Sequence, residues 1–297
     1  MADSPAHKFG QMIGDVLEIT VEPILSDFAT KYGLYLDKKG PRPARKGNKV
    51  SWTDLNGNKH DLDFVLERGG TAAKRGTPVA FIEAAWRRYT KHSRNKAQEI
   101  QGAIVPLCET HHRYHPFKGA VLAGVFTTGA LNQLKSLGFS VAYFPYETVI
   151  QAFATVGIDA SSDETTPDDD FAKKFRRWDA LKPSNKSKVG RELARINAGE
   201  VQAFIEALRN VTMRTIKTVR ILPLHGHAVE WPNVEDAITF IQAYNEEGVS
   251  LPIVRYEVQV IYINGDKISG EFAAKDAAIE FLKSYSTLPV EAQNAAI

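Results

Sequence analysis

The chain has 297 residues, 43% of them hydrophobic, and is long enough to bury a sizeable core and to form two domains. No run of eighteen apolar residues occurs, which argues against a membrane-spanning helix. The first fourteen residues lack the basic-then-apolar pattern of a signal peptide. A single cysteine, Cys108, excludes an internal disulfide framework, so we expect a cytoplasmic protein.

The net charge of +2 hides an uneven distribution. Residues 1–150 carry 20 Lys and Arg against 14 Asp and Glu, whereas residues 151–297 carry 17 against 21. A basic half joined to a mildly acidic half fits a polyanionic partner for the first half. An excess of this size is also common on ordinary enzymes, so charge alone does not identify a nucleic-acid-binding protein.

The first 70 residues predict a helix, a basic loop and a hairpin. Apolar residues recur with a period near 3.6 over 9–32, which predicts one helix, or two helices separated near Pro23. The Pro- and Gly-containing segment 38–49 is either a solvated loop or an arm that contacts phosphates. Asn56-Gly57 then predicts a tight turn between strands, which we expect at 50–55 and 59–67.

Helices and strands alternate after this hairpin. A loop rich in Gly, Lys and Arg occupies 69–76, and the elements predicted beyond it are a strand at 78–85, a helix at 87–107, a strand at 119–126, a helix at 130–137 and a strand at 140–144. Alternation of this kind predicts an α/β fold in which helices cover a mixed sheet.

The C-terminal part predicts a separate α+β domain. Residues 159–170 are acidic and almost free of apolar side chains, so we place a first domain at 1–158, a linker and helical segment at 159–218 and a second domain at 219–297. The second domain contains a repeat, in which a hairpin turning at Gly226 or Gly265 precedes a helix carrying Asp-Ala and then Phe. A duplicated ββα unit predicts an antiparallel sheet with two helices on one face, serving recognition or dimerisation.

Two acids stand on neighbouring predicted strands. Asp63 precedes an apolar Phe-Val-Leu run, and Glu83 lies inside the apolar strand that follows. A carboxylate in such a strand is costly unless it is paired or binds a metal ion. Oxygen ligands select Mg²⁺, with Mn²⁺ as the alternative. We therefore predict a metal site at Asp63 and Glu83, with Asp61 as either a weaker further ligand or a solvated residue on the same face as Asp63.

In these residues the chain resembles the PD-(D/E)XK nuclease superfamily, the fold of many type II restriction endonucleases, over roughly 9–153. Asp63 matches the acid of the family, and Glu83-Ala84-Ala85 matches its acid–x–Lys motif. The resemblance implies a restriction-endonuclease-like sheet and a Mg²⁺-dependent DNA endonuclease of a restriction or phage-defence system. It also implies double-stranded DNA as substrate and a homodimer, because one site cuts one strand.

The lysine of that motif is replaced by Ala85. The apolar stripe Ile100, Ile104 and Leu107 of the next predicted helix extends back to Lys96, which would then point toward the sheet. Lys96 either replaces the missing catalytic lysine or only extends along the edge of the helix. Weaker accessory candidates are Glu18 on the first helix and Glu99 beside Lys96.

The predicted helix at 87–107 is basic near its start and would attract a DNA backbone. Together with the 38–49 loop it supplies the DNA-binding candidates Arg87, Arg88, Lys91, Arg94, Lys46 and Lys49. A zinc site at Cys108 and the nearby histidines His111 to His115 is disfavoured, because no second ligand cluster accompanies it. We expect these histidines at a helix end.

Two other functions stay open at this level. Ala85 leaves room for a catalytically inactive protein that uses a nuclease fold to bind nucleic acid or a partner. A structure-specific DNA-repair nuclease would have the same acids and would differ in its activity on branched DNA.

Overall fold

The computed structural model describes residues 4–90, 93–223, 227–246, 255–263 and 265–286. It divides into two compact units, Met1–Thr212 and Met213–Ile297. No helix within these described ranges is long and apolar enough to cross a membrane.

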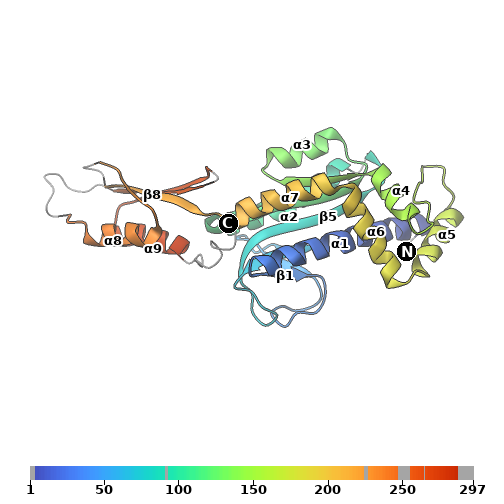
Figure 1. Cartoon of the computed structure of the whole chain (residues 1–297), viewed down its shortest axis with the longest axis horizontal. Helices are drawn as coiled ribbons and strands as arrows, with labels where there is room; N and C mark the ends of the chain where they lie inside the picture. The colour runs from blue at the N-terminus through green and yellow to red at the C-terminus, as the bar shows by residue number, and fades with distance from the viewer. Residues whose placement is uncertain (1–3, 91–92, 224–226, 247–254, 264, 287–297) are drawn as a thin grey trace. The chain divides into compact units, whose positions relative to one another are not determined.

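The first unit is built on a five-stranded sheet with the order β1-β4-β5-β6-β7 (Figure 1). Its strands are β1 Leu34–Lys38, β4 Phe64–Arg68, β5 Thr77–Arg87, β6 Phe117–Gly124 and β7 Ser140–Pro145. The first three are antiparallel neighbours, and β5, β6 and β7 run parallel. The expected mixed sheet flanked by helices is therefore confirmed as an α/β architecture.

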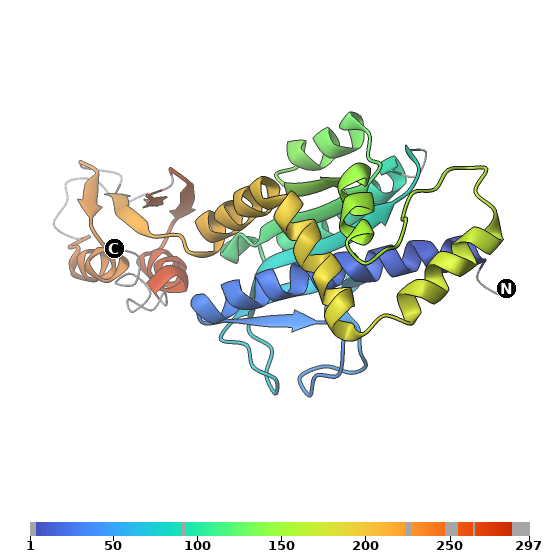
Figure 2. The same cartoon turned by 45° about the vertical axis from the view of Figure 1, so that its right-hand side comes forward.

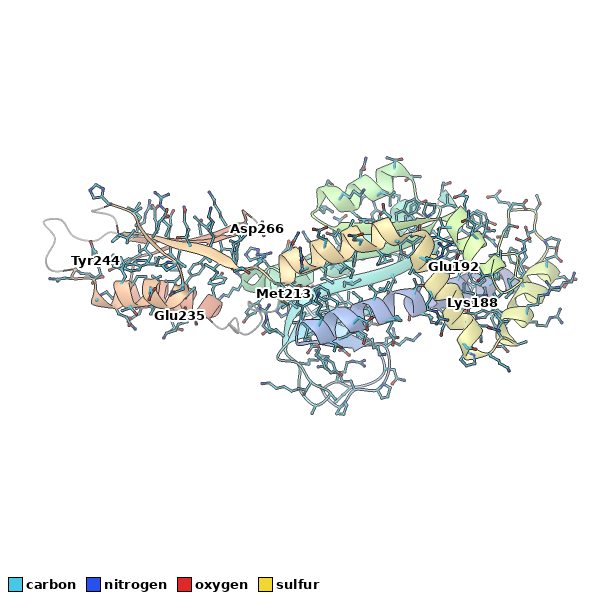
Figure 3. The ribbon with its side chains drawn as sticks, viewed as in Figure 1. Lys188, Glu192, Met213, Glu235, Tyr244 and Asp266 are labelled. Atoms are coloured by element: carbon cyan, nitrogen blue, oxygen red, sulfur yellow. The ribbon has the colours of Figure 1, made fainter. Side chains whose placement is uncertain are left out.

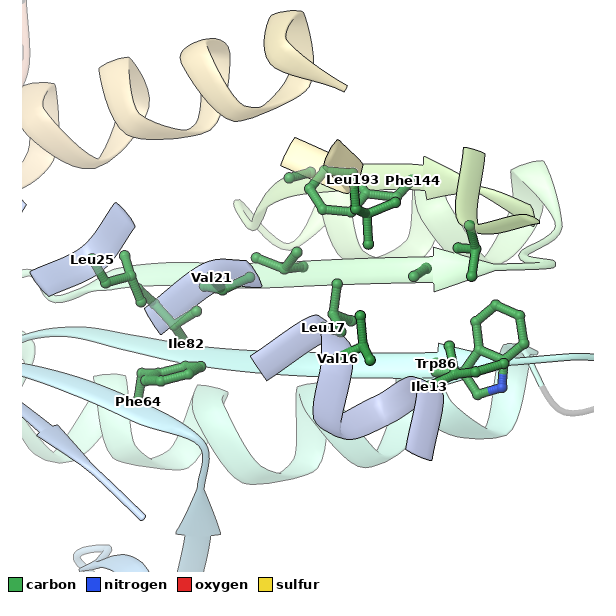
Figure 4. Packing of buried hydrophobic residues seen from close by; sticks show 14 of the residues in the cluster. Ile13, Val16, Leu17, Val21, Leu25, Phe64, Ile82, Trp86, Phe144 and Leu193 are labelled. Carbon is green, nitrogen blue, oxygen red and sulfur yellow. The ribbon is translucent and has the colours of Figure 1, made fainter. Parts of the chain in front are cut away.

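A long helix, α1 Pro5–Lys31, covers one face of this sheet. The Ser4 hydroxyl caps its first turn by accepting a hydrogen bond from the His7 backbone N–H at 3.2 Å. The helix continues through Pro23, because its long apolar side offsets the hydrogen bond that proline removes. That side packs onto strand residues such as Phe64 and Ile82, whereas Phe144 of β7 lies beside Leu193 (Figure 4).

Helices distant in sequence join α1 on this face. They are α4 Tyr146–Ala154, α5 Asp168–Asp179, α6 Pro183–Ile196 and α7 Ala198–Thr212. Figure 2 shows α5 and α6 running beside α1, and the rings of Phe9 and Phe171 stand 5.5 Å apart between α1 and α5. Figure 3 marks Lys188 and Glu192 on α6. The segment expected as a linker and helical stretch thus contains helices that pack on the first unit.

The opposite face is covered by α2 Ser93–Thr110, α3 Thr128–Ser136 and a separate two-stranded hairpin, β2 Val50–Thr53 with β3 Lys59–Leu62. The chain leaves this hairpin at Asp63 and enters β4 directly afterwards. The predicted strand 59–67 is therefore two strands in two different sheets. The bend at Asp63 separates them.

The predicted helix at 87–107 begins too early. Parallel pairing with β6 continues along β5 as far as Arg87, which lies opposite Gly124. Helix α2 starts only at Ser93. Arg87 therefore ends a strand and Arg88 precedes the helix, so the proposed basic helix is wrong for these two residues.

The second unit contains, in chain order, β8 Ile216–Pro223, β9 Val229–Trp231, α8 Val234–Ala243, β10 Tyr256–Tyr262, β11 Lys267–Phe272 and α9 Lys275–Ser286. Its antiparallel sheet has the order β11-β10-β8-β9. Figure 3 marks Glu235 on α8 and Asp266 between β10 and β11. Gly265 takes a left-handed φ of 89° in that connection, whereas Gly226 lies outside the described residues.

Candidate active site

The register of β4 and β5 brings Asp63 and Glu83 together. Phe64 pairs with Ile82 at the end of the β4–β5 ladder, and Asp63 and Glu83 are the residues next to this pair. The Ala84 backbone N–H donates to Asp63 Oδ2 at 2.7 Å and fixes this carboxylate against β5.

Both carboxylates face the side of the sheet that α2 covers. Val65, Phe81 and Ala85 lie in the core beneath α2. Each is two residues from Asp63 or Glu83, and residues two apart along a strand point to the same face of the sheet. Ala85 is 4% exposed there and supplies only a methyl group. Glu83 and Ala85, two residues apart on β5, therefore share this face.

Lys96 reaches the acid pair from α2. Its Nζ lies 3.9 Å from Glu83 Oε2, and its side chain is 19% exposed. Ala97 and Ile100 beside it on the helix are fully buried, so the face carrying Lys96 points to the sheet, as the apolar stripe predicted. An ammonium group thus stands next to Glu83 although Ala85 occupies the strand position.

The two carboxylates have raised pKa values. Burial and then the charge of Asp63 raise the pKa of Glu83 to about 8, against the lowering effects of Lys96 and of the hydrogen bond from the Asp63 backbone N–H. Burial also raises the pKa of Asp63, and the hydrogen bond from Ala84 and the charge of Lys96 oppose this rise. Without a cation the pair therefore holds a proton more tightly than free carboxyl groups do.

Glu18 on α1 lies within electrostatic reach of this pair. Its pKa is raised to about 7, first by burial and then by the charge of Asp63, while Lys39 lowers it. Among the residues that the structure describes, no three His, Cys, Asp or Glu side chains form a group that could hold a metal ion. The structure thus places Glu18 near Asp63 and Glu83 without completing a three-ligand group.

Glu99 links Lys96 to the end of β5. Glu99 Oε2 lies 3.3 Å from Lys96 Nζ and 3.5 Å from Arg87 Nη2. A chain of alternating charges therefore runs from Glu83 through Lys96 and Glu99 to Arg87. Arg87, a predicted DNA contact, is part of this chain.

Asp61 lies apart, on the exposed side of the β2–β3 hairpin. Its carboxylate accepts hydrogen bonds from Ser51 Oγ and, at 2.7 Å, from Lys49 Nζ. These bonds lower the pKa of Asp61, opposite in direction to the shift of Asp63. The same pairing occupies Lys49, another predicted DNA contact.

The remaining predicted DNA contacts have different surroundings. Arg88 stacks its guanidinium on the rings of Tyr89 and Phe171, at 4.4 and 4.6 Å. Lys46 and Arg94 are exposed. Lys91 lies outside the described residues.

The histidine cluster continues the end of α2, as expected. The helix ends at Thr110, and a short 3-10 turn, His112–Tyr114, follows. The His111 ring packs against Trp52 and Phe81 at 5.5 and 6.0 Å, and burial lowers its pKa.

Sequence reasoning missed a buried ion network beside the site. Arg42 Nη1 lies 2.8 Å from Asp37 Oδ2 and 2.5 Å from Glu67 Oε1, and all three side chains are at most 2% exposed. Arg45 Nε joins Asp37 at 3.2 Å. Nothing in the spacing of these residues indicates the network, because Arg42 and Glu67 are 25 positions apart and meet only in the folded chain.

Comparisons of the chain with protein-family models, curated proteins and solved structures found no significant match.

Proposed function

We propose that the first unit is a Mg²⁺-dependent DNA endonuclease of the PD-(D/E)XK type that hydrolyses phosphodiester bonds, acting in restriction or phage defence. The observation that carries this proposal is the position of Asp63 beside Glu83, with Lys96 Nζ 3.9 Å from Glu83 Oε2. Two acids and a lysine in one half-buried place are suited to phosphoryl chemistry.

The donor set fits a hard divalent cation. Asp63 and Glu83 are oxygen ligands, and burial raises the pKa of both. The negative charge of Asp63 raises the pKa of Glu83 further, and a bound cation would relieve this repulsion. Mg²⁺ in proteins uses one or two carboxylates and completes its shell with water and substrate phosphate, so a third protein ligand is not required. When bound there, the ion would supply a lowered pKa for water and charge for the phosphate oxygens.

The residues of the chain have separate tasks in this proposal. Asp63 and Glu83 hold the cation, and Glu83 must lose its proton to do so. The Lys96 ammonium donates a hydrogen bond to a phosphate oxygen or to the attacking water. It takes the role of the motif lysine, whose position is occupied by Ala85. Glu99, itself paired with Arg87, orients Lys96.

Double-strand cleavage would require a homodimer, because one such site cuts one strand. The second unit, with its separate antiparallel sheet and helices, is the candidate for dimerisation or for target recognition. Its two successive hairpin-and-helix segments are consistent with a duplicated ββα unit.

Two observations favour a second candidate, a nuclease-like protein that only binds nucleic acid or a partner. Ala85 supplies no ammonium on the strand, and Lys96 lies closer to Glu99 than to Glu83. In this candidate the acids and Lys96 form a structural ion network.

Incubation with supercoiled plasmid and with branched duplexes, in Mg²⁺ and in EDTA, separates the candidates. We expect Mg²⁺-dependent cleavage by the wild type, loss of cleavage in Glu83→Gln, and full activity in Glu147→Gln, which changes an exposed acid on α4. Cleavage by neither wild type nor variants would support the binding protein. Activity restricted to branched substrates would identify a structure-specific nuclease.

A further inference from the structure

Two loops beside the candidate site contain cations and no acids. Residues 38–49 and 69–76, which we call the basic platform, hold eight Lys and Arg and neither Asp nor Glu. Six of the eight are exposed: Lys38, Lys39, Lys46, Lys49, Lys74 and Arg75. The charged residues of the platform itself are therefore all positive.

Hydrogen bonds join the two loops into one surface. The Ala44 backbone N–H donates to Ala72 O at 3.0 Å. Arg42 Nη2, from the first loop, donates to Thr71 O and Lys74 O in the second, at 2.8 and 2.9 Å. The loops are thus held at a fixed spacing, although about thirty residues separate them in the chain.

The buried ion network holds the two loops together, and the ion pairs of the described chain divide the cations of the platform into paired and unpaired ones. Asp37 and Glu67 neutralise Arg42 and Arg45 beneath the surface. Lys38 and Lys49 pair with Glu22 and Asp61 at the margin. Within the described residues, Lys39, Lys46 and Lys74 form no ion pair or side-chain hydrogen bond, so these three are available to an external anion.

The register of the sheet connects the platform to the acid pair. Lys38 pairs with Phe64 at the end of the β1–β4 ladder, and Lys39 and Asp63 are the residues next to this pair. Phe64 also pairs with Ile82 of β5, which directly precedes Glu83. Lys39, Asp63 and Glu83 therefore adjoin one row of paired residues, Lys38, Phe64 and Ile82, on three neighbouring strands that stand about 4.8 Å apart. In agreement, the charge of Lys39 lowers the pKa of Asp63.

We propose that the basic platform binds the sugar-phosphate backbone of duplex DNA and leads it along Lys39 to the Asp63–Glu83 pair. The inference rests on the proposed function, since it names the surface that holds the substrate of that site. Exposed lysines on rigidly held loops are suited to contact the phosphates of the backbone. Such contacts do not recognise the base sequence. A membrane surface is disfavoured, because membrane binding by a protein surface also needs apolar side chains, and none of the large exposed hydrophobic residues of the described chain lies on the platform.

Fluorescence anisotropy with a labelled 30-base-pair duplex in EDTA tests the platform without cleavage. The triple variant Lys39→Gln, Lys46→Gln, Lys74→Gln is compared with a control triple of equal charge change, Lys8→Gln, Lys135→Gln, Lys182→Gln, whose residues are exposed elsewhere on the first unit. We expect the platform variant to bind at least about tenfold more weakly at 50 mM salt and to reduce the slope of log K against log salt by about 3. The control should bind as the wild type does.

Equal binding by wild type and platform variant, or an equal loss in the control, would overturn the inference. So would binding of the wild type to phosphatidylserine vesicles or polyglutamate but not to the duplex. Failure of the proposed function gives a different result. DNA binding that depends on the platform, without Mg²⁺-dependent cleavage, would support the platform as a DNA-binding surface and contradict the proposed nuclease activity. If the platform variant cleaves and binds DNA as the wild type does, only the proposed role of the platform is contradicted.

Discussion

Lys96 Nζ lies 3.9 Å from Glu83 Oε2, so an ammonium group from α2 stands beside the buried acid of β5. Glu99 Oε2 also lies 3.3 Å from the same ammonium group. A lysine ammonium is thus near Glu83 although Ala85 occupies the strand position two residues after Glu83. The proposed chemistry depends on the contact between Lys96 and Glu83.

Substitution of Lys96 should reduce cleavage without removing the metal. We expect Lys96→Ala to lower the cleavage rate by about 10² or more, because a positioned charge or proton donor contributes about 10²–10⁴ to such reactions. Single-turnover plasmid cleavage measures the rate, and Lys135→Ala on α3 serves as the charge-matched control. Undiminished activity in Lys96→Ala would exclude Lys96 from the chemistry.

Binding of Mg²⁺ should release protons near neutral pH. The pKa of Glu83 is raised to about 8 and that of Glu18 to about 7, so both groups carry protons that a bound cation displaces. Affinity should therefore increase as pH rises from about 6 to about 9. Isothermal titration calorimetry in two buffers with different ionisation heats measures the proton release. A heat independent of the buffer would contradict the expectation, and Glu83→Gln should abolish most of the release.

The same raised pKa makes the metal-free protein less stable at higher pH. Between the ordinary value of 4.5 and about 8, folded Glu83 holds its proton while the unfolded chain has lost it. The folded state therefore binds more protons, and its free energy of unfolding falls as pH rises through this range. Glu83→Gln has no such proton, so its stability relative to the wild type should increase from pH 5 to pH 8 in thermal unfolding with EDTA. A constant difference between the two proteins would contradict this.

The network beneath the basic platform should contribute strongly to stability. Glu67 is fully buried and pairs with Arg42, and its Oε2 also accepts the Gly76 backbone N–H at 2.6 Å. Glu67→Gln leaves the Arg42 charge buried with only Asp37 to neutralise it, which should cost about 3–5 kcal/mol of unfolding free energy. Urea unfolding measures this loss. As a control, Glu192→Gln breaks a surface ion pair with Arg195 on α6 and should change stability little. An equal loss of unfolding free energy in Glu67→Gln and Glu192→Gln would contradict a larger stabilising effect of the buried network.

Local patterns in the sequence were sufficient for β5, which carries Glu83, and for the part of α2 that carries Lys96, but not for the bend at Asp63 between β3 and β4. Glu83 was identifiable because a carboxylate in an apolar strand stands out from its neighbours, and Asp63 because it directly precedes an apolar run. Lys96 could be oriented because helical periodicity extends a buried stripe by one turn, and its buried neighbours Ala97 and Ile100 agree with that orientation.

Tertiary structure decided what these residues touch. The proximity of Lys39, Asp63 and Glu83 depends on the register of the strands beside them. The burial of Arg42 against Glu67 joins residues 25 positions apart, and the strand position of Arg87 depends on parallel pairing with β6. Periodicity records which face of an element is buried, but it does not record which partner lies opposite. The sequence therefore determined the two acids and the face of α2 that carries Lys96, whereas pairing between distant strands alone decided which cations border them and which lie buried below.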